Sequence, residues 1–213
     1  MKPLFLQYAN NEILKGMIED HAERHIHYCE RHDYHYFPVI RLGEHFDWFD
    51  KIRLILEAVK SGNYSHVFWI DADCFVVDGT QDMRDTLPYW ASYAFCIHPK
   101  PWQGQSFHFN AGVQYYDAGT DARDFLGAVK GMEGQCTDEY DQTAINDLLI
   151  LNNIGYRTWQ MGLSILPDKW NCTLGVHDLS PDNPPVLAAF HGHEFPVRRR
   201  EVMREWAERL PYR

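Results

Sequence analysis

Apolar and polar positions over the first seventy residues follow two alternating periods. Three short runs have the apolar, β-branched or aromatic content of buried strands, namely Leu4–Ala9, residues 36–42 and residues 67–70. Between them, apolar residues recur at helical spacing in residues 13–28, after an N-cap at Asn10-Asn11, and in residues 46–60. Strand, helix, strand, helix, strand is the order of a doubly wound α/β unit with a mostly parallel sheet.

Beyond residue 78 the pattern is mixed. It predicts the strands 93–98, 109–116, 156–160 and 186–190, and the helices 122–132, 141–151 and 198–209. The last helix is basic, and it is expected to pack back on its own domain rather than on a membrane. No repeat or linker divides the chain, so we expect residues 1–213 to form a single domain.

Composition and charge narrow the function classes. With 45% hydrophobic residues and a formal net charge of −10, the chain is typical of a globular protein and unlike a duplex nucleic-acid binder, so no nucleic-acid partner is expected. The five cysteines contain no CxxC pair, which argues against a zinc cluster or a disulfide framework and favours a reducing compartment. No apolar stretch is long enough for a transmembrane segment.

Two acidic residues directly follow the third predicted strand. Asp71 and Asp73 come after Ile70, with the small residue Ala72 between them. Ligands of open α/β sheets bind beyond the carboxyl ends of the strands. In an extended segment both carboxylates would point the same way while Ala72 turns away, and converging carboxylates suit Mg²⁺ or Mn²⁺. The competing interpretation is a solvated acidic turn.

The run from Tyr64 to Asp73 resembles the core motif of nucleotide-sugar glycosyltransferases with the GT-A fold, families 8 and 34 in particular. Further matching segments stand in the order that those families use: Lys51, Phe109-Asn110-Ala111-Gly112-Val113, Asp141-Gln142, Trp170-Asn171 and His191-Gly192. The ending departs from the family's His-x-x-Gly and lysine, because here Phe190-His191-Gly192-His193 precedes Arg198-Arg199-Arg200. The resemblance implies a Rossmann-like, mixed and mostly parallel central sheet flanked by helices. It also implies a nucleotide-binding half near residues 1–78 and an acceptor half near residues 79–213.

The same resemblance implies an enzyme that moves a hexosyl or pentosyl unit from a UDP-sugar to an acceptor hydroxyl on a glycan or glycoprotein. Mn²⁺ or Mg²⁺ would assist, with Asp71, Asp73 and His191 as ligands and His193 as the alternative histidine. The remaining donor-binding candidates are Gln7, Tyr8 and Asn10, assigned to the loop after the first strand, with Lys51, Ala72 and Gly192. Asn110, Asp141 and Gln142 are the catalytic candidates. Retention of anomeric configuration is expected, whereas Asp141 acting as a general base would imply inversion.

Several of these residues have plainer interpretations. Asn110-Ala111-Gly112 could be a bulge, and Asp141 a helix N-terminal charge. Arg53 competes with Lys51 for the phosphate-facing role. The histidines of the first predicted helix are expected to be surface or helix-face residues rather than metal ligands, although His21 and His25 fall at the apolar helical spacing.

Two other function classes compete with the glycosyltransferase. One is a metal-dependent nucleotidyltransferase or phosphohydrolase, and the other is a non-catalytic nucleotide-sugar-binding module. The loop after the first strand lacks the glycine-rich, basic character of related nucleotidyltransferases, and both acids and the Asp-Gln pair are present. These features favour the glycosyltransferase. Size and the lack of an anchor suggest a cytoplasmic enzyme, in a bacterium or a virus-infected host cell, or one domain of a longer multidomain chain.

Overall fold

The computed structural model describes residues 1–43, 47–98, 108–136, 140–151, 161–174, 177, 184–190 and 196–213. The strands are β1 (Leu4–Ala9), β2 (His35–Ile40), β3 (His66–Ile70), β4 (Cys74–Val76), β5 (Tyr93–His98), β6 (His108–Asp117), β7 (Leu163–Leu166), β8 (Cys172–Thr173) and β9 (Leu187–Ala189). The helices are α1 (Glu12–His32), α2 (Asp50–Lys60), α3 (Thr120–Gly131), α4 (Asp141–Asn146) and α6 (Pro196–Arg209). A π-helical turn, Asp147–Leu151, follows α4, and Met83–Thr86 and Asp168–Trp170 are 3₁₀ turns.

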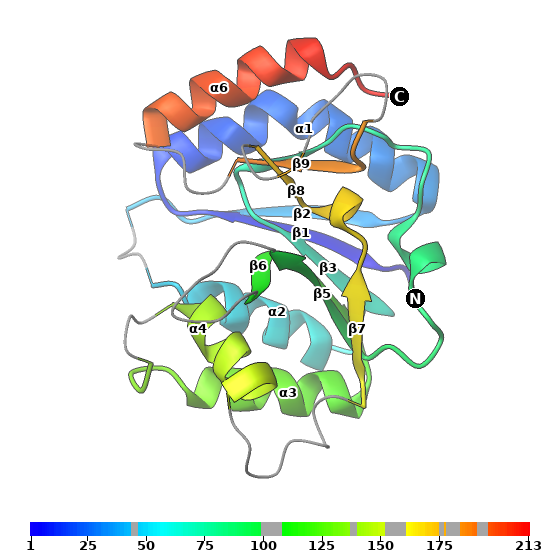
Figure 1. Cartoon of the computed structure of the whole chain (residues 1–213), viewed down its shortest axis with the longest axis vertical. Helices are drawn as coiled ribbons and strands as arrows, with labels where there is room; N and C mark the ends of the chain where they lie inside the picture. Colours follow the sequence, from blue (N-terminus) through cyan, green and yellow to red (C-terminus); the bar gives the residue numbers. More distant parts are fainter. Residues whose placement is uncertain are drawn as a thin grey trace.

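A six-stranded sheet in the order β2-β1-β3-β6-β5-β7 forms the centre of the molecule (Figure 1). β1 pairs in parallel with both β2 and β3, and β5 pairs in parallel with β7. β6 is antiparallel to both of its neighbours, β3 and β5. The sheet is therefore mixed with one reversed strand. The predicted α/β class and mostly parallel sheet are confirmed.

Helices cover both faces of this sheet. Figure 1 shows α1 and α6 on one side and α2, α3 and α4 on the other. A three-stranded sheet in the order β4-β9-β8 lies beside α1 and α6. Apolar side chains of the central strands and helices fill the space between the layers, with large rings such as Trp69, Phe95 and Phe125 fully or almost fully buried.

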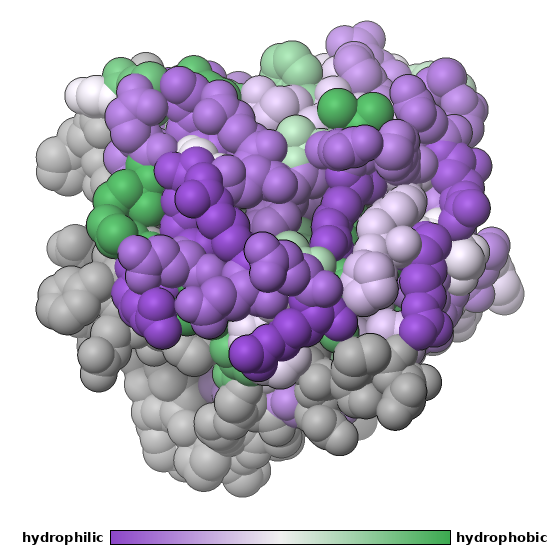
Figure 2. Space-filling view, turned by 90° about the horizontal axis from the view of Figure 1, so that it is seen from above, coloured by the Kyte–Doolittle hydropathy of each residue, from purple (hydrophilic) through white to green (hydrophobic). Residues whose placement is uncertain are grey.

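The last helix packs on the first, as expected. Met203 and Leu210 are fully buried in a cluster with Met17 and Phe190. Seen from above, the outer surface over these helices is mostly hydrophilic (Figure 2). Asp20 of α1 also forms ion pairs with two arginines of α6, Arg200 at 2.6 Å and Arg204 at 2.8 Å. In the parts of the chain that the structure describes, no helix is both long and apolar enough to cross a membrane.

Most predicted elements are confirmed within a few residues, and the exceptions are of three kinds. The helix predicted over residues 46–60 begins only at Asp50, because Asp47 accepts a hydrogen bond from the Phe49 amide and starts a turn. The strands β4, β7 and β8 have four residues or fewer and were not predicted. The strand expected at residues 156–160 lies outside the described residues.

Two predictions about side-chain type can be compared directly with the structure. All five cysteines are buried thiols rather than halves of a disulfide, in agreement with the interpretation that they form no disulfide framework. The alternative that His21 and His25 lie on the surface is wrong, because they are 3% and 0% exposed. His21 stacks on Phe75, and His25 packs against Phe5. They occupy the apolar stripe of α1, and they do so as aromatic core residues.

Candidate active site

Asp71 and Asp73 lie in a turn that connects β3 to β4. The Cys74 amide donates to the Asp71 carbonyl at 3.1 Å, and the Asp71 amide donates to the Gly112 carbonyl at 2.8 Å. The extended geometry expected for this segment is therefore wrong. The turn nevertheless brings both carboxylates to one cavity, while Ala72 packs against Ala9 and Ile18 and still contributes to the cavity wall.

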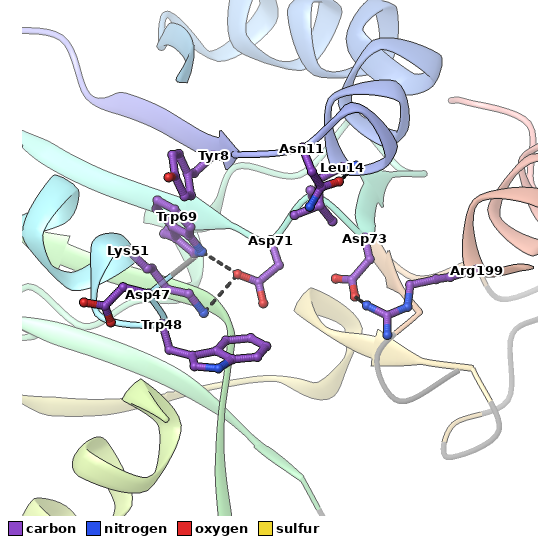
Figure 3. Close-up of a pocket in the computed structure, with 11 residues that line it drawn as sticks. Tyr8, Asn11, Leu14, Asp47, Trp48, Lys51, Trp69, Asp71, Asp73 and Arg199 are labelled. Carbon is purple, nitrogen blue, oxygen red and sulfur yellow. Dashed lines mark hydrogen bonds and ion pairs between the residues drawn. The ribbon is translucent and has the colours of Figure 1, made fainter. Parts of the chain in front are cut away.

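The cavity has a volume of about 300 Å³ and opens beyond the carboxyl ends of β1 and β3. Its lining residues are Tyr8, Asn11, Leu14, Asp47, Trp48, Lys51, Trp69, Asp71, Ala72, Asp73 and Arg199 (Figure 3). A cavity at this end of the sheet is where α/β folds bind ligands. It contains both aromatic faces and charged groups, which suits a ligand with a base or sugar ring and an anionic part.

Lys51 joins two carboxylates at the inner end of the site. Its Nζ atom lies 3.0 Å from Asp71 Oδ1 and 3.1 Å from Asp141 Oδ2. It also donates to the Ala111 carbonyl at 3.0 Å. Burial alone would lower the pKa of Lys51, but the carboxylates of Asp141 and Asp71 raise it above its usual value, so the group stays an ammonium ion. The buried Asp141 has a raised pKa, because loss of hydration outweighs the attraction to Lys51.

Asp71 and Asp73 have different partners. Asp71 Oδ1 accepts a hydrogen bond of 2.7 Å from the Trp69 indole, in addition to the ion pair with Lys51. Asp73 is almost buried, and its Oδ2 atom lies 2.7 Å from the Arg199 guanidinium of α6. Figure 3 shows the two acids pointing toward these separate cations. Each acid therefore meets a positive charge from a distant part of the sequence.

Asn110-Ala111-Gly112 lies at an irregularity of β6, which agrees with the plainer interpretation of this segment as a bulge; the pairing with β5 shifts between Phe95 and Cys96. Asn110 Oδ1 accepts from the Gly112 amide and from Asn171, both at 2.7 Å. Gln142 Oε1 accepts from the Ala111 amide at 3.0 Å. These amide side chains fix the backbone that supports both Asp71 and Lys51. In this structure Asn110 and Gln142 therefore act on the backbone, beneath the cavity.

The donor-binding candidates near the N-terminus divide into two groups. Gln7 and Tyr8 belong to β1 itself, which corrects their assignment to the following loop. Tyr8 lines the cavity, whereas Gln7 is fully buried and hydrogen-bonds to Tyr36 and to the Asp71 carbonyl. Asn10 is 5% exposed and accepts from the Asn11 side chain, and it is Asn11 that reaches the cavity wall.

The structure also distinguishes Lys51 from Arg53, the two candidates for the phosphate-facing role. Lys51 lines the cavity, while Arg53 forms ion pairs with Asp47, Asp50 and Glu133. Trp170 is fully buried in the core. Trp48 and Asp47 line the cavity but were not predicted, because a turn before a helix carries no periodic signal. The candidates His191, Gly192 and His193 lie outside the described residues.

The acid pair suits a hard divalent cation. Carboxylate oxygens are the ligands that Mg²⁺ and Mn²⁺ prefer. Asp47 already pairs with Arg53, so the charges that remain around the cavity are the carboxylates of Asp71 and Asp73 and the cations Lys51 and Arg199. Over the described residues, no cluster of three or more histidine, cysteine or acidic groups forms a ready-made metal site. A cation held here would need a ligand from the bound substrate or from the remaining residues.

This sheet order, with acids beyond β3 and a small second sheet, is the architecture of GT-A glycosyltransferases, and solved structures of that class match it. A glycosyltransferase involved in the glycosylation of the major capsid of PBCV-1 aligns with a TM-score of 0.72 and 16% identity, over 96% of this chain and all of its own. The galactosyltransferase LgtC aligns with a TM-score of 0.58 and 12% identity, over 99% of this chain and 97% of its own.

The glycosyltransferase GlyE of Streptococcus pneumoniae TIGR4 aligns with a TM-score of 0.53 and 16% identity. The alignment covers 97% of this chain but 60% of GlyE. No protein-family model and no curated protein sequence matches the chain. The likeness therefore establishes the glycosyltransferase fold, and activity and substrates are matters for proposal.

Proposed function

We propose that this chain is a glycosyltransferase that transfers a sugar from a UDP-sugar to an acceptor hydroxyl, assisted by Mn²⁺ or Mg²⁺. The observation that carries the proposal is the position of Asp71 and Asp73, which face one cavity with Lys51 and Arg199 in a sheet of glycosyltransferase order. The similar LgtC structure is a galactosyltransferase in complex with donor and acceptor sugar analogs, which supports a two-substrate site here.

The charged residues have distinct roles in this proposal. Negative charge builds on the departing diphosphate as the sugar leaves, and a bound divalent cation would supply Lewis-acid stabilisation of that charge. Asp71 and Asp73 would hold the cation. Lys51 is fixed by two carboxylates and adds a preorganised positive charge. Arg199 pairs with Asp73 at 2.7 Å at the cavity wall, and its guanidinium has further N–H groups that would contact the diphosphate.

Retention remains our preferred stereochemical outcome. A general base on the acceptor hydroxyl must come within hydrogen-bond distance of it. Asp141 is 3% exposed and paired with Lys51 beneath the cavity. A carboxylate in this position stabilises Lys51 and is too deeply buried to contact an acceptor hydroxyl. Asp141 is therefore a poor candidate for the general base that an inverting reaction would need.

Thermal unfolding with nucleotides tests the proposal. We expect UDP with Mn²⁺, at about a hundred times its dissociation constant, to add roughly 2.7 kcal/mol, a shift of about 5–10 °C. GDP, CDP, and UDP without the metal should shift the curve less. The shift should vanish in Asp73→Asn and persist in Asp124→Asn, which changes an exposed acid on α3. If no nucleotide shifts the native protein in the presence of metal, the donor assignment is wrong.

A further inference from the structure

Two large aromatic side chains lie partly exposed beside the cavity. Trp48, in the turn before α2, is 43% exposed, and Tyr140, the N-cap of α4, is 39% exposed. Their ring centroids are 4.7 Å apart and their planes meet at 71°, the edge-to-face arrangement of an aromatic pair. Trp69 and Trp170 are by contrast 2% and 0% exposed. The pair thus differs from the tryptophans that form the core.

The position of the pair is fixed by the charged cluster. Trp48 precedes Lys51 by three residues, and Tyr140 directly precedes Asp141. The ion pair of 3.1 Å between Lys51 and Asp141 therefore joins the same two elements that carry the aromatic rings. Trp48 also lines the cavity, and Figure 3 shows its ring lying next to Lys51 and Asp71. Trp48 therefore forms part of the cavity wall, and Tyr140 extends this wall with a partly exposed ring packed edge-to-face against the indole.

This wall suits a neutral sugar ring. A pyranose has an apolar C–H face that packs on an aromatic face, and hydroxyl groups around its edge that need polar partners, so an amphipathic ring such as tryptophan or tyrosine is a suitable contact. The anionic diphosphate of a donor belongs instead with Lys51 and Arg199. Tyr8 lies at the β1 side of the cavity, away from Trp48 (Figure 3), where it could contact the base.

We propose that Trp48 and Tyr140 form the platform on which the acceptor saccharide binds, as specificity-determining residues of the transfer reaction. The inference rests on the proposed function, because an acceptor is needed only if the site transfers a sugar. The platform would hold the acceptor within reach of the donor above Lys51 and Asp71. A charged or strongly apolar acceptor would find less complementarity here than a neutral saccharide.

NMR of the tryptophan indole N–H groups tests the platform without requiring turnover. The probes are the methyl α- and β-pyranosides of glucose, galactose, mannose and xylose, with lactose and maltose, added to protein saturated with UDP and the diamagnetic Mg²⁺. The Trp48 signal is identified by its loss in Trp48→Ala. We expect at least one saccharide to shift it, and the affinity for that saccharide, measured by calorimetric titration, to fall about tenfold or more in Trp48→Ala and Tyr140→Ala. Trp90→Ala, which removes an exposed tryptophan before β5, should leave binding unchanged.

The outcomes separate the platform from the donor site. If UDP and Mn²⁺ stabilise the protein but no saccharide shifts the Trp48 signal, the platform is wrong and the proposed function stands. Saccharide binding of equal strength in native protein and Trp48→Ala would also overturn it. If saccharides shift Trp48 while no nucleotide stabilises the protein, the platform stands as a saccharide site and the donor assignment fails.

Discussion

At the level of single residues, the ammonium group of Lys51 contacts carboxylates from two different elements within 3.1 Å. Its side chain is 11% exposed and that of Asp141 is 4% exposed. A buried charge without its partner is far more costly than the net worth of the pair. Lys51 is therefore expected to matter for stability as well as for binding a diphosphate.

Replacement of Lys51 by methionine tests this charge balance. Lys51→Met should destabilise the protein by about 3 kcal/mol or more, because the buried Asp141 loses its counter-ion. Urea unfolding measures the change. Adding Asp141→Asn should recover at least half of the loss, since an amide needs no counter-ion. If the double variant is as unstable as the sum of both single variants, the coupling between Lys51 and Asp141 is absent.

The buried histidines predict a dependence of stability on pH. Burial is the main cause that lowers the pKa of His21 to about 4, and the positive charge of Arg24 adds to it. Burial is also the main cause that lowers the pKa of His25 to about 3, with smaller contributions from His21 and Arg24. Both groups bind protons more strongly in the unfolded chain, where the pKa is about 6.5. Their contribution to stability is therefore complete above pH 6.5 and is lost as the pH falls toward the folded values. At pH 5 each should cost about 2 kcal/mol.

Urea unfolding at pH 7.5 and pH 5 of His25→Phe measures that dependence. Neither ring nitrogen of His25 has a hydrogen-bond partner in the described residues, so phenylalanine forfeits no hydrogen bond. The variant should lose less stability than the native protein on acidification. His27→Gln, on the exposed face of α1, should behave like the native protein. A His25→Phe profile as steep as the native one would show that His25 is not the titrating group.

Helix α6 is held on α1 by the apolar cluster around Met203, by the ion pairs of Asp20 and by Arg24. Arg24 donates to the carbonyls of Ala207 and Leu210 at 2.7 and 2.9 Å, at the C-terminal end of α6. A cation at this end of a helix also interacts favourably with the helix dipole. Because α6 carries Arg199 to Asp73, these contacts also position a residue of the cavity.

Replacement of Arg24 by methionine should loosen α6. We expect a loss of about 2–3 kcal/mol, since hydrogen bonds to charged groups are removed from partly buried carbonyls. Urea unfolding gives the stability change, and hydrogen exchange should show reduced protection of α6 amides. The control Arg198→Ala removes a side chain that is 59% exposed and whose ion pairs within the described parts of the chain are with acids of α6 itself. Equal effects of the two changes would contradict an anchoring role for Arg24.

The elements show where sequence patterns were sufficient. α1 and β3 were predicted closely because each has one strong period and a clear boundary, such as the Asn11 cap that accepts from the Ile13 and Leu14 amides. β4 and β8 have only three and two residues, and their partner β9 lies far along the chain, so no local period identifies them.

The site was predicted in part, for similar reasons. Asp71 and Asp73 were found from their place after a strand, and Lys51 from the family resemblance. The contact between Asp73 and Arg199 joins residues 126 positions apart, and that distance hides it from any local pattern. The depth of Gln7 beneath the cavity likewise depends on how β1 packs, which its sequence alone does not reveal.

At the scale of the whole molecule, the two proposed halves share their secondary structure. β6, from the second half, pairs with β3 of the first along five residues, and β9 pairs with β4. α6 packs on α1. Neither half has a complete sheet without the other, so they are expected to unfold together.

Calorimetry tests whether the two halves unfold as a single cooperative unit. We expect one transition with an enthalpy of about 150 kcal/mol near 60 °C, from the usual value per residue, and agreement between calorimetric and van't Hoff enthalpies. UDP with Mn²⁺ should move the whole transition. Two resolved transitions, of which only one responds to nucleotide, would mean that the halves are separate domains.

The reaction itself is tested most directly by incubating UDP-sugars with the protein, Mn²⁺ and a saccharide panel, and recording ³¹P NMR spectra after a chelator has removed the metal. The proposed glycosyltransferase should convert at least one UDP-sugar to UDP in a metal-dependent reaction that is lost in Asp73→Asn. Asp124→Asn should retain it. Cleavage to UMP and a sugar 1-phosphate would identify a phosphohydrolase and contradict the account. Binding of UDP with no product from any UDP-sugar would favour a non-catalytic binding module.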